Sequence, residues 1–423
     1  MRLRLKNVGK IISADVEING ITVIAGENAT GKSTIGKALY CIFNSLYNLE
    51  RNIELERVYT IATILEKGMA FSRQLPSREF LKAARYILDR YILEKNGEYS
   101  QNHLHLLNEL SDFYNQVGLP YNSKIDNLAQ DIYDALSVSS SEIANKIFED
   151  KVQAEFAMQI NSFRYSGYPS EITLEIKGKE TKAIIEYNKN INISNALDLN
   201  TEVIYIDDPY IVDSLRIPLN TSGRRRSKRY NHRKHLNDRM VQQSSKLSII
   251  SEMTAAKKLD NVFERINSVC AGEMVKKTSM SFAYTEKNTK HMIEAENMST
   301  GLKTFAIIKT LLLNGSLEEN GALILDEPEI HLHPEWQLVF AEVIVLLQKE
   351  FNLHVLMNTH SPYFLDAIDV FSHMHGIADK CKYYLAENID EIATIKDVSH
   401  ELNLIYEKLF RPLQRLENER YSI

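Results

Sequence analysis

The sequence predicts an α/β fold with a mixed β-sheet and an inserted helical subdomain. Three observations support this prediction. A β-branched strand, a glycine-rich turn and a helix follow one another near the N-terminus, helical periodicity dominates residues 50–160, and helices alternate with apolar strands over residues 296–375. A chain of 423 residues is long enough for one large core that carries such an insertion.

Composition and charge fit a soluble globular protein. Hydrophobic residues make up 44% of the chain and charged residues 25%, and a net charge of -6 argues against nucleic-acid binding over the whole surface. No apolar run is long enough to span a bilayer, and the first ten residues lack the apolar core of a signal peptide, so we expect a cytoplasmic protein. The isolated cysteines Cys41, Cys270 and Cys381 fit a reducing compartment and argue against a zinc site or a disulfide framework.

Residues 1–48 are predicted to form the first part of the main domain. The segments RLRLKNVG and ADVEINGITVIAG alternate or are β-branched, as strands are, and Asn19-Gly20 is a hairpin-turn signal. A helix should follow from Ser33 to about Leu46.

Residues 49–162 are predicted to form the helical subdomain. SREFLKAARYILDRYILEKNG starts at a serine cap and stops at Asn-Gly, and SSSEIANKIFEDKVQAEFAMQI starts in the same way, with apolar residues at helical spacing. Gly, Pro and Asn interrupt this region too often for a long coiled-coil arm, so we expect a compact insertion.

The rest of the chain is predicted to return to the main domain. Residues 163–215 hold strands: EITLEIKGKETKAIIEYN is a hairpin around Lys-Gly-Lys, and TEVIYI is a buried strand that ends in a turn at Asp207-Asp208-Pro209. Residues 216–245 are predicted to be a basic loop or linker. A helix, KLSIISEMTAAKKLDNVFERINSVC, then opens the last part of the main domain, residues 246–423.

The segment VIAGENATGKST combines a strand, a tight turn and a helix start in the spacing GxxxxGK[ST]. Glycine at both ends lets consecutive N–H groups converge on phosphate oxygens, Lys32 would reach the β- and γ-phosphates, and Ser33 would ligate magnesium. We therefore predict a site for ATP and Mg2+. Its nucleotide-binding residues are Gly26, Asn28, Gly31, Lys32, Ser33 and Thr34.

An acidic motif follows a buried strand in GALILDEPEIHLHPEWQ. In phosphoryl-transfer ATPases an acid at this place holds the magnesium, and a nearby group positions the attacking water. We assign Asp326 to the metal, together with Ser33, and Glu327 to the catalytic base. Two acids alone would more simply be a polar strand end, and it is the phosphate loop that favours the ATPase assignment.

The segment LHVLMNTHSPYF repeats this layout, with an apolar strand followed by Thr-His-Ser-Pro. A histidine at a strand end is usually a surface or capping residue. Here it falls at the carboxyl edge of a sheet, where α/β proteins bind ligands. We predict that His360 is a catalytic residue that contacts the γ-phosphate.

These motifs in this order resemble the ABC-type ATPases, specifically their soluble SMC/RecF-like branch. The motifs are GENATGKST, MSTGLKT, LILDEPEIHLHPE and NTHSP, and the resemblance covers residues 1–46 and 296–365. It implies an ABC-type (P-loop) head that sandwiches ATP between two subunits, so that the chain forms a homodimer or higher homo-oligomer. The phosphate loop of one head then faces the signature motif of the other.

The signature motif of this family is roughly L-S-G-G-Q, and MSTGL aligns with it. The resemblance assigns Ser299 and Gly301 to nucleotide binding, while the first glycine and the terminal glutamine of the pattern are replaced. Gln74 and Gln101 are candidates for the family's Q-loop glutamine by position, although each fits a surface residue of the helical insertion better.

Within this branch, DEPEIHLHPEWQ and THSPYFL look most like the ATPases of bacterial antiphage systems and of the overcoming-lysogenisation-defect family. Chain size and NGITVIAGENATGKST favour the ATPase subunit of the Septu type. This resemblance implies an HNH nuclease subunit as a partner. We expect no nuclease site in residues 361–423, because they lack the acidic strand end and D-x-D arrangement that two-metal chemistry needs.

Positive charge gathers in RRRSKRYNHRKH, residues 224–235. Such a run is often a solvated loop, and an acidic protein partner is another interpretation. The arginines and the interleaved tyrosine favour contact with DNA or another nucleic acid, with an affinity that falls steeply as salt rises. The candidate residues are Arg224, Arg225, Arg226, Lys228 and Arg229.

Three functions compete on the sequence alone. The first is an ATPase that pairs through ATP and regulates a separate nuclease in phage defence. The second is a RecF/SMC-like ATPase for DNA repair or DNA loading, and the third is the ATP-binding subunit of a membrane transporter. The large helical insertion and the missing Q-loop disfavour the transporter, and genomic neighbours would separate the first two.

Overall fold

The computed structural model describes most of the chain as two compact units. The described residues are 1–68, 76–93, 107–108, 110–112, 124–162, 164, 167–216, 230–242, 260–278, 281–286, 292–390 and 392–421. The larger unit, here called the head, comprises Met1–Tyr47, Phe148–Pro218 and Lys228–Ile423. The smaller one, here called the helical unit, comprises Asn48–Ile147 and Leu219–Ser227.

The helical unit has its own hydrophobic core. Its main helices are α2 (Leu49–Gly68), α3 (Ser77–Leu93), α5 (Lys124–Ser137) and the first part of α6 (Ser140–Phe156). Ile61, Ala84 and Ile132 are among the side chains that form one buried cluster. Ser139 caps α6, since its hydroxyl accepts a bond from the Glu142 N–H at 3.2 Å and the Glu142 carboxylate accepts one from the Ser139 N–H at 2.8 Å. The serine cap expected there is confirmed.

The boundary between the two units falls inside α6, at Ile147, whereas the sequence suggested residue 162. The last turns of α6 belong to the head because Phe148 and Val152 are buried there and Glu155 binds His232. A helical apolar pattern indicates a buried face, but it does not indicate which core buries it.

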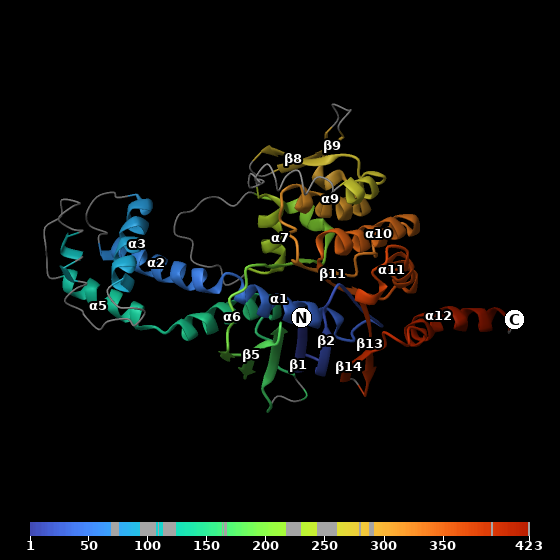
Figure 1. Ribbon diagram of the computed structural model, residues 1–423, viewed down its shortest axis with the longest axis horizontal. Coiled ribbons are helices and arrows are strands. Elements are labelled where there is room, and N and C mark those ends of the chain that lie inside the picture. The colour runs from blue at the N-terminus through green and yellow to red at the C-terminus, as the bar shows by residue number, and fades with distance from the viewer. Residues whose placement is uncertain are drawn as a thin grey trace. The chain divides into compact units, whose positions relative to one another are not determined.

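An eleven-stranded mixed sheet forms the centre of the head (Figure 1). Its order is β6-β5-β4-β1-β2-β14-β13-β3-β12-β11-β7. The strands are β1 (Arg2–Val8), β2 (Ile11–Glu17), β3 (Ile21–Gly26), β4 (Ser170–Ile176), β5 (Lys179–Glu186), β6 (Asn190–Ser194), β7 (Val203–Ile206), β11 (Ala322–Asp326), β12 (His354–Thr359), β13 (Cys381–Ile389) and β14 (Ile392–Asp397). The run from β13 to β7 is parallel and the run from β6 to β2 is antiparallel. The predicted α/β class with a mixed sheet is confirmed.

The hairpin expected at Asn19-Gly20 is wrong. Gly20 has the left-handed φ of 76° that the turn signal predicts, but β3 does not pair with β2. It enters the sheet between β12 and β13 instead, and the first hairpin joins β1 to β2 with Val8 opposite Ile11. A local turn signal reports the bend of the chain and not the partner of the next strand.

The second predicted hairpin is confirmed. β4 and β5 are antiparallel, with Ile176 opposite Lys179. Lys177 and Gly178 between them have φ values of 51° and 77°, as a type I′ turn requires.

Helices cover both faces of the parallel strands. α1 (Lys32–Leu46) lies on the face to which Tyr205 and Ile324 point, since a Cβ added at Gly36 would meet both of them. α9 (Thr300–Leu313), α10 (Pro334–Phe351) and α11 (Pro362–Met374) share a core with Leu323 and Leu325, which point to the other face. In Figure 1, α9 and α10 lie above β11, and α11 lies beside it, above β13. α1 and α9 therefore cover opposite faces of the sheet.

The remaining described elements complete the head. They are η1 (Pro209–Ser214), α7 (His232–Met240), β8 (Glu273–Thr278), β9 (Ser281–Thr285), β10 (Met292–Glu294), η2 (Ala295–Asn297), η3 (Ala378–Lys380) and α12 (Asn403–Tyr421). β8, β9 and β10 form a separate antiparallel sheet. Of the helix predicted in 246–270, residues 260–267 are helical, and the part before residue 260 lies outside the described residues. Over the described ranges, no helix has the length and apolar character to cross a membrane.

Candidate functional site

The glycine-rich loop between β3 and α1 is shaped by two close approaches. Gly26 lies against β13, where an added Cβ would be 2.2 Å from the carbonyl oxygen of Ala386. Gly31 has a φ of 85°, and an added Cβ would meet Ile11 at 3.0 Å. Neither position accepts a side chain, which explains the glycine spacing seen in the sequence.

Lys32 begins α1 and is buried under this loop. Its Nζ donates hydrogen bonds to the carbonyl oxygens of Gly26 and Glu27, each at 2.8 Å, and lies 3.8 Å from Oε1 of Glu327. Burial lowers the pKa of Lys32, and the Glu327 and Asp326 carboxylates oppose that shift. These three oxygen contacts hold an ammonium group that phosphate oxygens can bind in their place.

The other predicted loop residues lie around Lys32. Asn28 is exposed in the loop, Ser33 is exposed in the first turn of α1, and Thr34 is partly buried next to it. The Thr34 N–H donates to the Gly31 carbonyl oxygen at 3.0 Å, which closes the first turn of the helix. The Ser33 hydroxyl is therefore presented at the helix start, where the free N–H groups favour an anion.

Asp326 ends β11 on the sheet face that carries α1. Its Oδ1 accepts a hydrogen bond from Asn358 Nδ2 at 2.9 Å, and its Oδ2 accepts one from the Tyr205 hydroxyl at 2.9 Å. Mg2+ takes oxygen ligands and is usually held by one or two carboxylates together with substrate phosphates. In the described part of the chain no group of three or more His, Cys, Asp or Glu side chains is placed to hold a metal alone. The oxygens of Asp326 and Ser33 fit a site that is shared with phosphate.

Glu327 lies between Lys32 and His360. Its φ of 51° is left-handed, and its N–H donates to the carbonyl oxygen of Asn358 at 2.9 Å. One carboxylate oxygen is 3.8 Å from Lys32 Nζ, and the other is 3.2 Å from Nδ1 of His360. A left-handed φ is costly for glutamate, and such backbone strain is often found at functional sites. Here the strained turn directs the carboxylate toward the lysine and the histidine.

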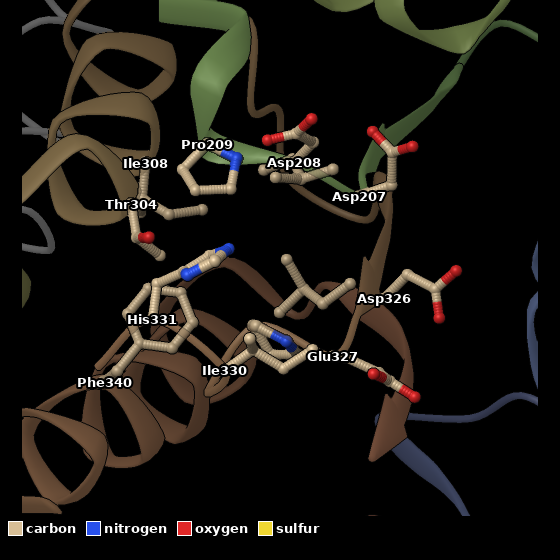
Figure 2. Close-up of a pocket in the computed structure, with 13 residues that line it drawn as sticks. Asp207, Asp208, Pro209, Thr304, Ile308, Asp326, Glu327, Ile330, His331 and Phe340 are labelled. Atoms are coloured by element: carbon tan, nitrogen blue, oxygen red, sulfur yellow. The ribbon is translucent and has the colours of Figure 1, made fainter. Parts of the chain in front are cut away.

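A small pocket lies beside these acids (Figure 2). Its lining includes Asp207, Asp208, Pro209, Thr304, Ile308, Ile330, His331 and Phe340. Its volume of about 40 Å³ suits one or two water molecules and not a nucleotide. Figure 2 shows the carboxylates of Asp326 and Glu327 pointing to one side, away from His331. Asp326 and Glu327 therefore border this pocket, but their carboxylates point away from it, and that of Glu327 faces Lys32.

Sequence reasoning missed several polar residues of the site. Glu329 is 2% exposed, and its carboxylate accepts a hydrogen bond from the Thr359 hydroxyl, which ties the DEPE turn to the THSP turn. Burial raises the pKa of Glu329. A second acid two residues after Glu327 was a usable signal in the sequence. The sequence carried no signal for Tyr205 or Asn358, because only the order of the strands in the sheet brings them to Asp326.

Ser299 and Gly301 open α9, on the other face of the sheet from α1. Ser299 is the N-cap, with an extended ψ of 146°, and its side chain makes no capping hydrogen bond. Gly301 packs on α10, where an added Cβ would be 3.0 Å from Trp336 and 3.2 Å from the carbonyl oxygen of His331. Lys32, Asp326, Glu327 and His360 are here called the lysine cluster. Among the described residues, no contact joins Ser299 or Gly301 to the lysine cluster of the same chain.

The IDDPYIVD segment follows β7 and packs against α9. Asp208 caps η1, because its carboxylate accepts from the Tyr210 N–H at 2.8 Å, so the strand-terminating interpretation of this turn is confirmed. Asp213 forms a 2.5 Å ion pair with the buried Lys303, and the Tyr210 hydroxyl accepts from Thr300 at 3.2 Å. The same segment therefore braces the first turn of α9.

The first half of the basic segment, residues 224–229, lies outside the described residues. This applies to Arg224, Arg225, Arg226, Lys228 and Arg229, and also to the Q-loop candidates Gln74 and Gln101. The loop or linker predicted over residues 216–245 is wrong for residues 232–240, which form α7. There Arg233 pairs with Asp207 at 2.8 Å and Arg239 pairs with Glu202 at 2.5 Å. Positive charge in this part stabilises the head through internal ion pairs.

Comparison with known proteins agrees with this geometry. A family model described as AAA ATPase domain matches residues 1–365. The retron Vc95 probable ATPase of Vibrio cholerae serotype O1 biovar El Tor is 32% identical over 83 residues, a segment that covers 17% of this chain and 16% of that protein. The match to the retron protein therefore spans only a small part of either chain.

Solved SMC heads also align with the chain. The SMC head domain from Thermotoga maritima is 10% identical with a TM-score of 0.39, over 94% of this chain and 98% of that one. An SmcHead bound to the C-winged helix domain of ScpA is 12% identical with a TM-score of 0.44, over 95% and 98%. The match to the AAA ATPase domain model extends over residues 1–365. Because that match spans the glycine-rich loop and both strand-end motifs, the chain belongs to the AAA ATPase domain family.

Proposed function

We propose that this chain binds and hydrolyses ATP with Mg2+ and regulates a separate nuclease in bacterial antiphage defence. The observation that carries the ATPase proposal is the convergence of Lys32, Glu327 and His360 beside Asp326, at the carboxyl edge of the parallel strands. Ligands of α/β proteins bind at this edge. Family membership supports nucleotide binding independently of these distances.

Each residue of the cluster has a role in this proposal. Ser33 and Asp326 hold the magnesium, which would neutralise charge on the β- and γ-phosphates. Lys32 exchanges the loop carbonyls for phosphate oxygens. Glu327 orients the attacking water and accepts its proton, and His360 contacts the γ-phosphate.

ATP also pairs two subunits in this proposal. Ser299 offers a hydroxyl and Gly301 an N–H at the start of α9, where a helix favours an anion. Since α9 and α1 cover opposite faces of the sheet, the γ-phosphate that meets Ser299 belongs to a partner subunit. The resulting assembly is a homodimer or a higher homo-oligomer with ATP at its interface.

The defence role rests on resemblance. The matched segment of the retron ATPase and the DEPEIHLHPEWQ and THSPYFL motifs both favour it. We place the chain nearest to PtuA, the ATPase subunit of the Septu system, with an HNH nuclease as its partner in the cytoplasm. DNA or another nucleic acid would bind the basic segment. The second candidate is a RecF/SMC-like ATPase for DNA repair or loading, favoured by the same head motifs.

Replacement of Lys32 by alanine tests the nucleotide site. Lys32→Ala should weaken ATP binding at least about tenfold, because the β/γ-phosphate charge loses a charged partner. Titration with a fluorescent ATP analogue measures this, and Lys37→Ala on the same helix is the matched control. Full affinity in Lys32→Ala would remove Lys32 from the site.

Replacement of Glu327 by glutamine tests the base. Glu327→Gln should bind ATP normally but hydrolyse it about 100-fold more slowly, since the proton acceptor is lost. Phosphate release measures the turnover, with Glu335→Gln, an exposed acid near the start of α10, as the control. Normal turnover in Glu327→Gln would place the base elsewhere.

Purification with the genomic neighbour tests the defence role. If an adjacent gene encodes an HNH protein that co-purifies with this chain, DNA cleavage by the pair should depend on ATP. If the neighbours are replication or recombination genes and no nuclease co-purifies, the repair function takes its place.

A further inference from the structure

Tyr205 occupies a place beside Asp326 that the cross-strand register dictates. Tyr205 of β7 is opposite Ile324 of β11, and Asp326 is opposite Asn358 of β12. Side chains two residues apart on a strand share a face, so Asp326 points to the same face as Ile324. Tyr205 is its diagonal neighbour on one side and Asn358 its direct neighbour on the other.

Both carboxylate oxygens of Asp326 are held by these neighbours. The Tyr205 hydroxyl donates to Oδ2 and the Asn358 amide donates to Oδ1, each at 2.9 Å. A carboxylate can only accept hydrogen bonds, so the Tyr205 hydroxyl is the donor in this contact. Two donors on two oxygens fix the plane of the carboxylate.

The ring of Tyr205 is itself fixed on several sides. It is 1% exposed and stacks on the His232 ring with centroids 4.4 Å apart and planes tilted by 23°. His232 lies 2.6 Å from Glu155 of α6 and 3.0 Å from Asp207. On the α1 side, a Cβ added at Gly36 would be 3.3 Å from the Tyr205 hydroxyl, so glycine leaves the room that this hydroxyl occupies.

We infer that Tyr205 is a positioning residue that orients the Asp326 carboxylate for magnesium. A buried tyrosine with its hydroxyl on a carboxylate has a second interpretation, in which it only fills the core and satisfies the acid. The two interpretations differ in one respect. An orienting bond alters how tightly magnesium joins the nucleotide, whereas a merely structural bond alters stability. The inference rests on the proposed ATPase function.

The test removes the hydroxyl and keeps the ring. In a Glu327→Gln background, which prevents turnover, Tyr205→Phe and Tyr40→Phe are titrated with N-methylanthraniloyl-ATP in EDTA and at increasing Mg2+. Tyr40 is the matched control because it is also buried, and its ring lies 6.3 Å from that of Tyr205. Its replacement leaves the Tyr205–Asp326 bond in place.

Tyr205→Phe should bind the analogue in EDTA as the parent does. The Mg2+ concentration that gives half of the maximal increase in affinity for the analogue should rise about tenfold, because the hydrogen bond to the Asp326 carboxylate is lost. When Glu327 is retained, Tyr205→Phe should also raise the Mg2+ concentration needed for turnover, whereas Tyr40→Phe should match the parent.

Three outcomes would overturn the inference. The Mg2+ dependence of Tyr205→Phe equals that of Tyr40→Phe, or Tyr205→Phe loses affinity equally with and without Mg2+, or its only defect is a lower melting temperature. If the parent itself neither binds nor hydrolyses ATP, the proposed function fails first, and that result is separate because it appears before Tyr205 is changed.

Discussion

At the residue scale, His232 joins three elements of the head. Its Nδ1 lies 2.6 Å from Glu155 of α6, its Nε2 lies 3.0 Å from Asp207 beyond β7, and its ring stacks on Tyr205. Burial lowers the pKa of His232, but Asp207 and Glu155 together outweigh burial and raise it to about 9. His232 therefore carries a positive charge at neutral pH, when Asp207 also pairs with Arg233.

This pair of contacts should make stability depend on pH in the alkaline range. A raised folded pKa gives stability that is complete below the unfolded value of 6.5 and is lost as pH rises through about 9. The difference in unfolding free energy between the parent and His232→Gln should therefore shrink by up to about 3 kcal/mol between pH 6 and pH 10. Urea denaturation at each pH measures it.

In the acid pH range, Asp207 gives stability the opposite dependence on pH. Burial opposes the shift, but the contacts with His232 and Arg233 lower the pKa of Asp207, so its contribution to stability is lost only as pH falls below the ordinary range of the carboxyl.

The control for the His232 replacement is His373→Gln, at a side chain that is 66% exposed. A difference for His232→Gln that stays constant from pH 6 to pH 10 would contradict the charged state assigned to His232.

At the element scale, the sequence predicted what each segment does locally but not what lies beside it. The loop before α1, the β4–β5 turn and the acids after β11 follow from spacing alone, because each depends on residues close in the chain. The error at Asn19-Gly20 and the omission of Tyr205 have one cause. Strand order in the sheet decides both, since β3 and β7 take places that their own residues do not encode.

An ion pair joins η1 to α9, and its contribution to stability can be measured. Lys303 is buried on α9, and its Nζ pairs with the partly exposed Asp213 of η1 under the Tyr210 ring. Lys303→Met should cost ~2 kcal/mol of unfolding free energy, because it leaves the Asp213 carboxylate without its charge partner. Chemical denaturation measures the loss.

A double-variant cycle separates this ion pair from simple packing. Lys303→Met combined with Asp213→Leu should recover most of the loss, since no unpaired charge remains. Losses that simply add would show that Asp213 and Lys303 act independently, and the brace on α9 would then lie in Tyr210 and Thr300.

At the scale of the whole molecule, the head separates two halves of one proposed reaction. The lysine cluster lies at the sheet edge beside α1, and the signature residues open α9 on the opposite face. A single chain would then hold ATP without completing the site around the γ-phosphate. In this view hydrolysis reports that a second subunit has arrived, which is a property that a regulator of a nuclease can use.

Replacement of Ser299 tests this separation directly. Ser299→Arg should leave ATP affinity of the isolated chain within about twofold of the parent, because the variant side chain lies outside the lysine cluster. It should abolish ATP-dependent pairing, since a bulky group would occupy the place proposed for the partner's γ-phosphate. Light scattering after size-exclusion chromatography, with and without ATP in the Glu327→Gln background, measures pairing.

The matched control for this variant is Ser316→Arg, which lies beyond the C-terminal end of the same helix. Equal pairing by Ser299→Arg and the parent would reduce Ser299 to a helix cap. Loss of ATP binding by the isolated Ser299→Arg chain would place the signature and the phosphate loop in one site of one chain. Only retained binding with lost pairing supports an ATP molecule shared between two heads, because that result requires Ser299 to act on a nucleotide that its own chain does not hold.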